Sequence, residues 1–428
     1  MVDVQQLYQK YMECGAVCTD TRQIVQGSVF FALRGPSFNA NAFASDALQK
    51  GAAYAVVDDP AFAKNDQYLL VSDSLTSLQQ LASFHRSHLK IPVIGLTGSN
   101  GKTTSKELLN AVLSTKYRTF ATKGNLNNHI GVPLSILSID SSNEIAVIEM
   151  GANHVGEIAM LCAIANPTHG FITNIGKAHI GTFGGFENIV RAKSELYKHL
   201  ISHHGQVFIN SQNIVLSNMA KRFQNPLFYP AVGDYYHAEL ISADPFIQFK
   251  TELGEVVQTK LMGTYNFENV AAALCVAKFF GVDSKLANRA VAEYMPENMR
   301  SQILKKGTNT IILDAYNANP SSMAAAIENL SAMKASKKVL MLGDMYELEN
   351  EAEQEHREIG KLIREKGFRQ IYLVGKLFRS AASELPDAKF FESKQLLIDE
   401  LKEKPLDDST ILVKASRGIG LESILEFL

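Results

Sequence analysis

The sequence predicts an α/β protein of three domains: a small mixed α/β domain, a central parallel sheet with an antiparallel β addition, and a doubly wound, Rossmann-like C-terminal domain. Three observations predict this fold. The chain has 428 residues, which at about 150 residues per domain suggests about three domains. From Val93 onward, apolar strands alternate with helices, as in parallel βαβ units. Between Ala238 and Leu261 this alternation gives way to β-rich segments, and it then resumes.

The composition excludes several classes of protein. Hydrophobic residues make up 46% and charged residues 20% of the chain, which is too apolar for a disordered protein and ordinary for a globular one. A formal net charge of −2 lacks the bulk positive charge of nonspecific nucleic-acid binders, so we expect no nucleic-acid partner. No signal peptide and no apolar run of transmembrane length is recognisable, which predicts a soluble, cytoplasmic protein without membrane insertion. The four cysteines form no CxxC pair, as suits a reducing compartment.

The N-terminal domain is expected over residues 1–88. Short apolar runs predict its strands, and stretches with helical spacing lie between them. The expected strands are Val29 to Leu33, Ala53 to Val57 and Tyr68 to Val71, and the expected helices are Ala42 to Lys50 and Leu75 to His88. The Lys90-Ile91-Pro92 segment then marks the boundary with the next domain.

The central domain is expected over residues 89–299. Its strands are expected at Val93–Leu96, Ile145–Met150, Gly170–Asn174 and Val207–Asn210, with helices from Thr103 and at Val155–Ala163, Glu187–Leu200 and Asn266–Phe280. Parallel sheets of this kind bind ligands at the carboxyl ends of their strands. The β-rich stretch turns at Asp244-Pro245 and at Gly254, which predicts an antiparallel addition to the main sheet.

The C-terminal domain is expected over residues 300–428 as a second doubly wound unit. Its strands are expected at Thr310–Leu313, Val339–Leu342, Gln370–Val374 and Thr410–Val413, with a charged helix at Glu351–Lys366. This region has no GxGxxG fingerprint, so a dinucleotide is not indicated.

A glycine-rich turn joins the first apolar strand of the central domain to a helix and indicates a P-loop. Converging backbone N–H groups and the helix N-terminus can hold phosphates. The lysine can neutralise the β and γ phosphates, and the following threonine hydroxyl can bind Mg²⁺. The nucleotide-binding candidates are Gly98, Asn100, Gly101, Lys102, Thr103 and Thr104. Leu96 stands where the usual first glycine would be, so this segment alone also fits a tight turn with an incidental lysine.

Three further residues follow strands or lie on a helix of the same domain. Glu149 ends an apolar strand, where P-loop enzymes keep an acidic group for the metal of the nucleotide. His179 follows the next strand, and Lys193 lies on the helix after it. Taken alone, such a histidine is usually packed or solvated and such a lysine is usually surface charge.

These motifs, in this order, resemble the Mur ligase family, whose members build the peptidoglycan precursor. The runs that match in this order are Gly98–Thr104, Glu149–Gly151, Asn174–His179 and Ala192–Lys193. Further runs that resemble signatures of the family are Gly124–Leu134, Ala178–Gly184, Asp314–Pro320 and Leu342–Met345. The resemblance implies an ATP-dependent ligase that joins D-alanyl-D-alanine to UDP-N-acetylmuramoyl-tripeptide through an acyl phosphate. We expect the enzyme to act as a monomer.

The resemblance also implies the roles of metal and nucleotide residues. Lys193 would be carbamylated and would hold one Mg²⁺ ion with His179, while Thr103 and Glu149 would hold a second. The ATP contacts would come from Asn269, Arg300, Asp314 and Asn317. From the pattern alone, the asparagine is as well explained by helix capping, and an arginine in a linker is unremarkable. The last domain is expected to close over ATP by a hinge near Met299 to Ser301.

The remaining candidates would bind the substrates. The resemblance assigns Thr21 and Arg22 to the uridine diphosphate, although turn capping and a surface ion pair explain them nearly as well. Two neighbouring amides, Asn127 and Asn128, would face a sugar or peptide. Ser416 and Arg417 follow the last strand, where a dipeptide carboxylate could bind, and a helix N-cap is the equal alternative for the serine.

Other functions remain open from the sequence. A sister Mur ligase that adds a diamino acid and a folylpolyglutamate-type synthetase have the same core. A P-loop kinase or nucleotide-driven switch would need only the phosphate loop. The Asp314–Pro320 run favours the D-alanyl-D-alanine ligase.

Overall fold

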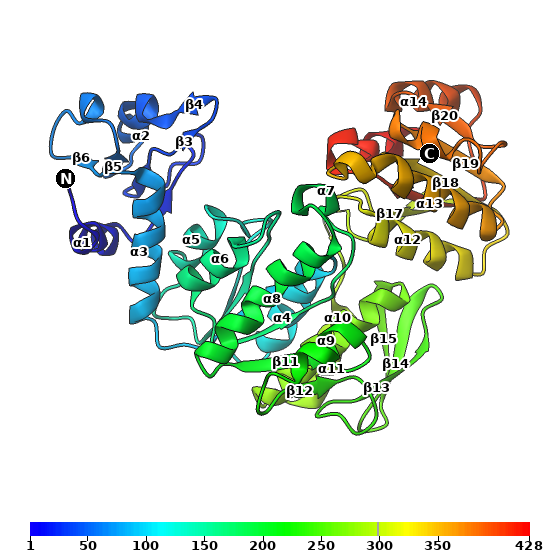
Figure 1. Cartoon of the computed structure of the whole chain (residues 1–428), viewed down its shortest axis with the longest axis horizontal. Coiled ribbons are helices and arrows are strands. Elements are labelled where there is room, and N and C mark those ends of the chain that lie inside the picture. The colour runs from blue at the N-terminus through cyan, green and yellow to red at the C-terminus, as the bar shows by residue number, and fades with distance from the viewer. Residues whose placement is uncertain (298) are drawn as a thin grey trace.

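The computed structural model describes residues 1–297 and 299–428. Figure 1 shows three bodies that follow one another along the chain, with the central body between the other two. Each body has its own main sheet, so the predicted α/β architecture is confirmed. Among the described residues, no helix has both the length and the apolar character that crossing a bilayer requires.

The N-terminal body is a four-stranded parallel sheet in the order β1-β2-β5-β6. Its strands are β1 (Val17–Cys18), β2 (Val29–Phe31), β5 (Tyr54–Val57) and β6 (Tyr68–Leu70), with a hairpin of β3 (Arg34–Gly35) and β4 (Phe38–Asn39) and the helices α1 (Val4–Cys14), α2 (Ala44–Gln49) and α3 (Ser74–His88). Helix α3 starts where the Asp73 side chain accepts the N–H of Thr76. It leads directly into the central sheet.

The central sheet has six parallel strands in the order β12-β11-β10-β7-β9-β8. The strands are β7 (Val93–Thr97), β8 (Thr119–Ala121), β9 (Ile145–Glu149), β10 (His169–Ile172), β11 (Gln206–Asn210) and β12 (Leu227–Tyr229). The helices are α4 (Lys102–Leu113), α5 (Gly131–Ile136), α6 (Glu157–Ala165), α7 (Ile180–Phe183), α8 (Phe186–Ser202) and α9 (Ile214–Ala220). Every residue of β7 and β9 is buried, so the ends of these strands are fixed by the core.

The prediction that antiparallel strands extend the main central sheet is wrong. The strands β13 (Ala238–Ser242), β14 (Phe246–Thr251) and β15 (Val256–Met262) form a separate three-stranded sheet and do not extend the main one. Buried and exposed residues alternate along β15, so this sheet has one apolar face. That face is covered by α10 (Thr264–Phe279) and α11 (Ser284–Glu293), which makes a layer of its own.

The C-terminal sheet has the order β16-β17-β21-β18-β19-β20, and all neighbours are parallel except β16 and β17. Its strands are β16 (Gln302–Lys306), β17 (Asn309–Leu313), β18 (Lys338–Gly343), β19 (Gln370–Val374), β20 (Lys389–Phe391) and β21 (Thr410–Lys414), with α12 (Pro320–Ala332), α13 (Ala352–Glu365) and α14 (Lys394–Glu403). The last strand, β21, is inserted between β17 and β18. The loops at the carboxyl ends of these three strands therefore meet at one point.

Candidate active site

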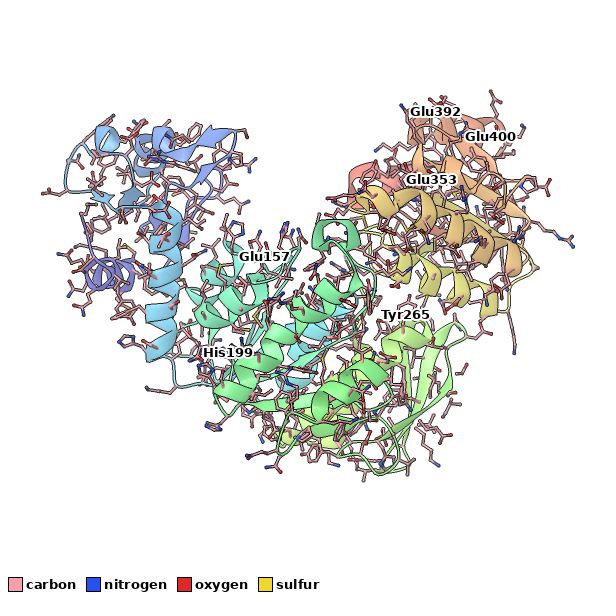
Figure 2. The ribbon with its side chains drawn as sticks, in the orientation of Figure 1. Glu157, His199, Tyr265, Glu353, Glu392 and Glu400 are labelled. Atoms are coloured by element: carbon pink, nitrogen blue, oxygen red, sulfur yellow. The ribbon has the colours of Figure 1, made fainter. Side chains whose placement is uncertain are left out.

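A cavity of about 520 Å³ lies between the central and C-terminal bodies. Its lining includes Lys102, Glu149, His179 and Arg300, so four sequence-predicted residues from distant segments meet at one place. Figure 2 places Tyr265 at the start of α10, where the central body faces the C-terminal one. The carboxyl ends of β7, β9 and β17 all point here, as expected for parallel sheets.

The phosphate loop is shaped by two glycines. Gly98 has φ 151°, and a Cβ there would lie 1.9 Å from Thr173 Oγ1. Gly101 has φ 78°, and a Cβ there would lie 2.6 Å from Asn269 Oδ1. Only glycine fits such positions without strain. Leu96, the departure from the usual motif, is fully buried in β7, so it belongs to the strand and leaves the loop unaffected.

Lys102 lies at the start of α4 with its ammonium folded back onto the loop. Its Nζ donates to the carbonyl oxygens of Gly98 at 2.7 Å and Ser99 at 3.3 Å. Burial lowers the pKa of Lys102, the nearby charge of Arg300 lowers it further, and Glu149 opposes both. An anion bound in the cavity would therefore relieve the repulsion between the positive charges of Lys102 and Arg300.

Glu149 ends β9 as a buried carboxylate, 1% exposed. Its Oε1 accepts the amide of Asn127 at 2.7 Å and lies 3.4 Å from the Thr103 hydroxyl. Its Oε2 is buried and finds no hydrogen-bond donor among the described residues. An unpaired buried carboxylate oxygen is costly, and carboxylate and hydroxyl oxygens are the ligands that Mg²⁺ prefers. The residues present therefore fit a magnesium ion at this point.

Lys193 lies on α8 as a buried lysine, 2% exposed, whose Nζ is 3.4 Å from the carbonyl of Ala152. Burial lowers its pKa to about 7, and the positive charge of Lys102 contributes, whereas Glu157 and Glu195 oppose the shift. A large fraction of this amine is thus neutral near pH 7. Lys193 is not among the described residues that line the cavity.

His179 lies at the edge of the cavity and touches the C-terminal body. Its backbone has φ 56°, and its Nδ1 is 2.6 Å from Glu347 Oε2. Within residues 1–297 and 299–428, no group of three His, Cys, Asp or Glu side chains is placed to hold a metal ion. The second predicted metal site is therefore not preassembled from these residue types, and it depends on the chemistry of Lys193.

The predicted nucleotide-binding residues differ in whether their polar groups already have hydrogen-bond partners. Asn269 accepts the hydroxyl of Ser105 at 2.9 Å and donates to Asn266 at 2.9 Å, so its amide joins α4 to α10. Arg300 lies 3.8 Å above the ring of Tyr316, and its buried Nε has no hydrogen-bond partner in the described part of the chain. Arg300 is the candidate with spare donors.

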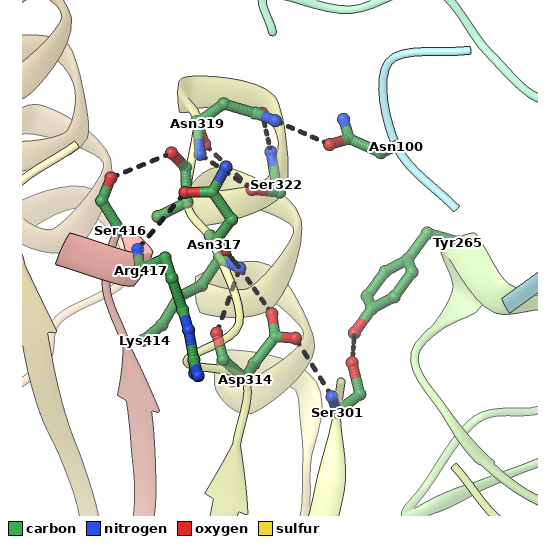
Figure 3. Close-up of polar contacts among 11 residues, drawn as sticks. Asn100, Tyr265, Ser301, Asp314, Asn317, Asn319, Ser322, Lys414, Ser416 and Arg417 are labelled. Atoms are coloured by element: carbon green, nitrogen blue, oxygen red, sulfur yellow. Dashed lines mark hydrogen bonds and ion pairs between the residues drawn. The ribbon is translucent and has the colours of Figure 1, made fainter. Parts of the chain in front are cut away.

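Asp314 and Asn317 serve contacts within the C-terminal body, as Figure 3 shows. Asp314 Oδ1 accepts the N–H of Ser301 at 3.0 Å, and Oδ2 lies 2.5 Å from Lys414 Nζ. Asn317 Oδ1 accepts the N–H of Arg417 at 3.4 Å. Lys414 was not among the sequence-predicted residues, although a lysine that ends the apolar run Thr410–Val413 is an available signal.

Ser416 is used as a bridge between loops. Its hydroxyl accepts the N–H of Tyr346 at 2.8 Å and lies 3.4 Å from the carbonyl of Ala318. The short turn that follows has no side-chain cap hydrogen bond, so the N-cap interpretation of Ser416 is wrong. The neighbouring Arg417 pairs with Glu422 at 3.3 Å and is 56% exposed.

The paired amides at positions 127 and 128 also have local partners. Asn127 orients the carboxylate of Glu149. Asn128 Oδ1 accepts the N–H groups of Ile130 and Gly131, at 3.1 and 2.9 Å, and so orders the turn that leads into α5. Glu149, the predicted metal ligand, therefore has a polar neighbour in Asn127, a residue that the sequence assigns to a sugar or peptide.

Thr21 and Arg22 are not brought to this cavity. They lie in the loop between β1 and β2 of the N-terminal body. Arg22 is 85% exposed and pairs with Asp20 at 2.7 Å. The side chain of this arginine is thus available to a ligand, but neither Arg22 nor Thr21 lies in the lining of the cavity.

The phosphate loop and the C-terminal body are in direct contact. Asn319 Nδ2 donates to Asn100 Oδ1 at 2.8 Å, as Figure 3 shows. Lys177 Nζ lies 2.6 Å from Glu355 Oε1. These contacts, with His179 and Glu347, fix how the two bodies face each other.

Comparisons with known proteins agree with this geometry. Residues 96–277 match the family model described as Mur ligase middle domain, and residues 299–417 match the one described as Mur ligase, glutamate ligase domain. The UDP-N-acetylmuramoyl-tripeptide–D-alanyl-D-alanine ligase of Bacillus subtilis is 35% identical over 424 residues, 96% of this chain and 92% of that protein.

Two solved structures extend the likeness to the whole fold. MurF from Acinetobacter baumannii superposes with a TM-score of 0.87 at 31% identity, covering 99% of this chain and 97% of the other. MurF ligase from Thermotoga maritima, solved in complex with ADP, gives a TM-score of 0.84 at 27% identity and covers 100% and 98%. The likeness holds for sequence and fold over nearly the whole length, and the chain therefore belongs to the Mur ligase family.

Proposed function

We propose that this chain is an ATP-dependent ligase that joins D-alanyl-D-alanine to UDP-N-acetylmuramoyl-tripeptide in peptidoglycan precursor synthesis. The observation that carries the proposal is the meeting of the phosphate loop with the buried Glu149, which lines a cavity large enough for a nucleotide and has one oxygen without a donor among the described residues. Relatives with this printed activity match nearly the whole chain at 30% to 35% identity. We expect the enzyme to act as a monomer in the cytoplasm.

The reaction has two steps. A carboxylate oxygen of the tripeptide attacks the γ-phosphorus of ATP, which forms an acyl phosphate and releases ADP. The amine of D-alanyl-D-alanine then attacks the acyl carbon, phosphate leaves with the bonding electrons, and the nitrogen loses a proton to give the amide. Lys102 and Arg300 stabilise the charge on the phosphoryl oxygens, and positioning supplies most of the remaining acceleration.

Magnesium, when bound, neutralises charge between ATP and the anionic acceptor. Thr103 and Glu149 would hold one ion, and Asn127 would keep the carboxylate in position. His179 and a carbamylated Lys193 would hold the other. Carbamylation joins the lysine nitrogen to the carbon of CO₂ and releases a proton, so it needs the neutral amine. The lowered pKa of Lys193, about 7, supports this step near neutral pH.

The other site residues are proposed with the roles that the family resemblance implies. The phosphates would lie on Gly98, Asn100, Gly101 and Thr104. Asn269, Asp314 and Asn317 would surround the rest of the nucleotide. Asp314 and Asn317 would form the side of the cavity that the C-terminal body supplies. Thr21 and Arg22 would contact the uridine diphosphate, and Asn128, Ser416 and Arg417 the acceptor and dipeptide.

The domain division supports a closing motion. We place the boundaries at residues 1–88, 89–299 and 300–428, with UDP binding, ATP binding and closure over ATP assigned in that order. Closure of the last domain would keep water from the acyl phosphate. Solution scattering should show compaction when nucleotide and acceptor are added, and an unchanged radius of gyration would contradict the closing motion.

The decisive experiment is mass spectrometry of the product formed from ATP, Mg²⁺, D-alanyl-D-alanine and each UDP-linked tripeptide. We expect an amide product, with phosphate released only when carboxylate and amine are both present. A panel of amines separates this activity from a sister ligase and from a folylpolyglutamate-type synthetase. A stable phosphorylated product would instead identify a kinase.

A further inference from the structure

The linker between the central and C-terminal bodies holds two residues in an unusual backbone conformation. Met299 has φ 57° and Ser301 has φ 50°. Residues other than glycine rarely adopt the left-handed region, and they remain there only when the surroundings hold them. Ser301 is buried, 6% exposed, so the groups that hold it can be identified.

Each body contributes one group that holds Ser301, as Figure 3 shows. From the C-terminal side, Asp314 Oδ1 accepts the backbone N–H of Ser301 at 3.0 Å. From the central side, the hydroxyl of Tyr265 lies 2.8 Å from Ser301 Oγ. Ser301 is thus attached to both bodies at the point where one must turn relative to the other.

Lys414 fixes the position of Asp314. Its side chain is 2% exposed, and its Nζ lies 2.5 Å from Asp314 Oδ2 and 3.2 Å from the carbonyl oxygen of Asn317. A buried ammonium needs a charged partner and further acceptors. Since both oxygens of Asp314 are engaged, one by Lys414 and one by the linker, movement of the lysine is transmitted to the linker.

The same lysine also reaches the loop after the last strand. The Asn317 loop that Lys414 holds accepts the N–H of Arg417 at 3.4 Å. Arg417 Nη1 in turn lies 3.6 Å from Met299 Sδ. The proposed dipeptide loop and the interdomain linker therefore share one buried cation.

We propose that Lys414 is a positioning residue that couples the dipeptide loop to the orientation of the C-terminal domain. It acts through Asp314, which holds Ser301 in its left-handed conformation, and Tyr265 completes the attachment to the central domain. This inference rests on the proposed function for the identity of the dipeptide, but the coupling itself concerns only the two domains and the nucleotide.

Two variants test this coupling from opposite sides of the linker. Lys414→Met removes the cation and keeps the length of the side chain. Tyr265→Phe removes one hydroxyl and leaves no charge unpaired. Tyr117→Phe is the matched control, because its hydroxyl donates to the carbonyl of Phe280 at 2.7 Å within the central body. Lys414→Arg tests rescue, since it retains the charge.

The readouts are solution scattering with a non-hydrolysable ATP analogue and Mg²⁺, and the separate KM values for ATP and D-alanyl-D-alanine. We expect both variants to lose most of the compaction of the wild type and to raise the KM for ATP at least fivefold. Only Lys414→Met should also raise the KM for the dipeptide, by about tenfold, and Lys414→Arg should recover part of each effect. Tyr117→Phe should match the wild type in all three measurements.

A purely structural role would give a different result. Lys414→Met would then lower the melting temperature and the active fraction, while the folded fraction kept wild-type KM values and compaction. That result would overturn the proposal, and so would wild-type compaction in Tyr265→Phe. If Lys414→Met does not fold, Tyr265→Phe decides alone. Loss of amide formation in the wild type would refute the proposed function and would leave the scattering result standing.

Discussion

The phosphate loop and the N-terminal loop around Thr21 were both predicted as binding segments, but they differ in structure. The phosphate loop follows a fully buried strand, and its glycines pack against Thr173 and Asn269 from distant parts of the chain. Arg22 extends into solvent and pairs with its neighbour Asp20. A motif at the carboxyl end of a parallel strand is positioned by the core, whereas an exposed loop depends on its ligand for order.

The largest expected effect is the loss of Lys102. Lys102→Met should lower kcat by about 10³-fold, because the phosphoryl charge then loses a preorganised cation. Phosphate release in the complete reaction mixture measures the loss, and Lys198→Met, on the exposed side of α8, is the control. A decrease in kcat of less than tenfold would contradict the difference that we expect between the phosphate loop and the N-terminal loop.

Substitution of Lys193 tests whether this buried lysine of the central domain is carbamylated. Lys193→Ala should lower kcat by at least about 10²-fold, and bicarbonate should not restore it. In the wild type, activity should fall below pH 7, because protonation of an amine with a pKa of about 7 removes the form that reacts with CO₂. Carbon-13 NMR with labelled bicarbonate should show the carbamate signal disappear over the same range. Near-normal turnover of the variant would exclude carbamylation from the mechanism.

Substitution of Asn127 tests how Glu149, the proposed metal ligand, is held in position. Asn127→Ala removes a 2.7 Å hydrogen bond to Glu149 and should raise the Mg²⁺ concentration for half-maximal activity by about 10-fold. Direct titration with Mn²⁺, followed by electron paramagnetic resonance, should show the same shift without turnover. Asn225→Ala, at an exposed position, should change neither value. An unchanged metal affinity with a higher KM for the UDP substrate would return Asn127 to the substrate site.

Arg22 should show the smallest effect. Its ion pair with Asp20 lies at the surface, where solvent screens it, and such pairs contribute little to stability. We expect Arg22→Ala to raise the KM for the UDP substrate by about fivefold or less, with kcat and melting temperature unchanged. Steady-state kinetics at varied UDP-substrate concentration measures this. A 100-fold increase in this KM would mean that the N-terminal loop becomes ordered into a binding site as well positioned as the phosphate loop.

The sequence predicted the parts of the fold that local patterns encode. Apolar strands, the glycine turn and the helix after it follow from spacing and propensity, and so did Glu149 at the end of its strand. The edge strands β16 and β20 were not predicted, and the antiparallel strands were attached to the wrong sheet, since strand pairing is decided by distant residues. Lys414, Tyr265 and Glu347 were missed for the same reason: each acquires its role from a partner that lies far away along the chain or across the domain boundary.

The contact between His179 and Glu347 joins side chains from two different domains at 2.6 Å. A ligand that engages the imidazole changes the free energy of this pair, and so does any rotation that withdraws the carboxylate. By thermodynamic reciprocity, the two events must influence each other by equal amounts. With the metal role proposed for His179, occupancy of this site and the angle between the two domains would form a single linked equilibrium, so the metal affinity would depend on the domain angle.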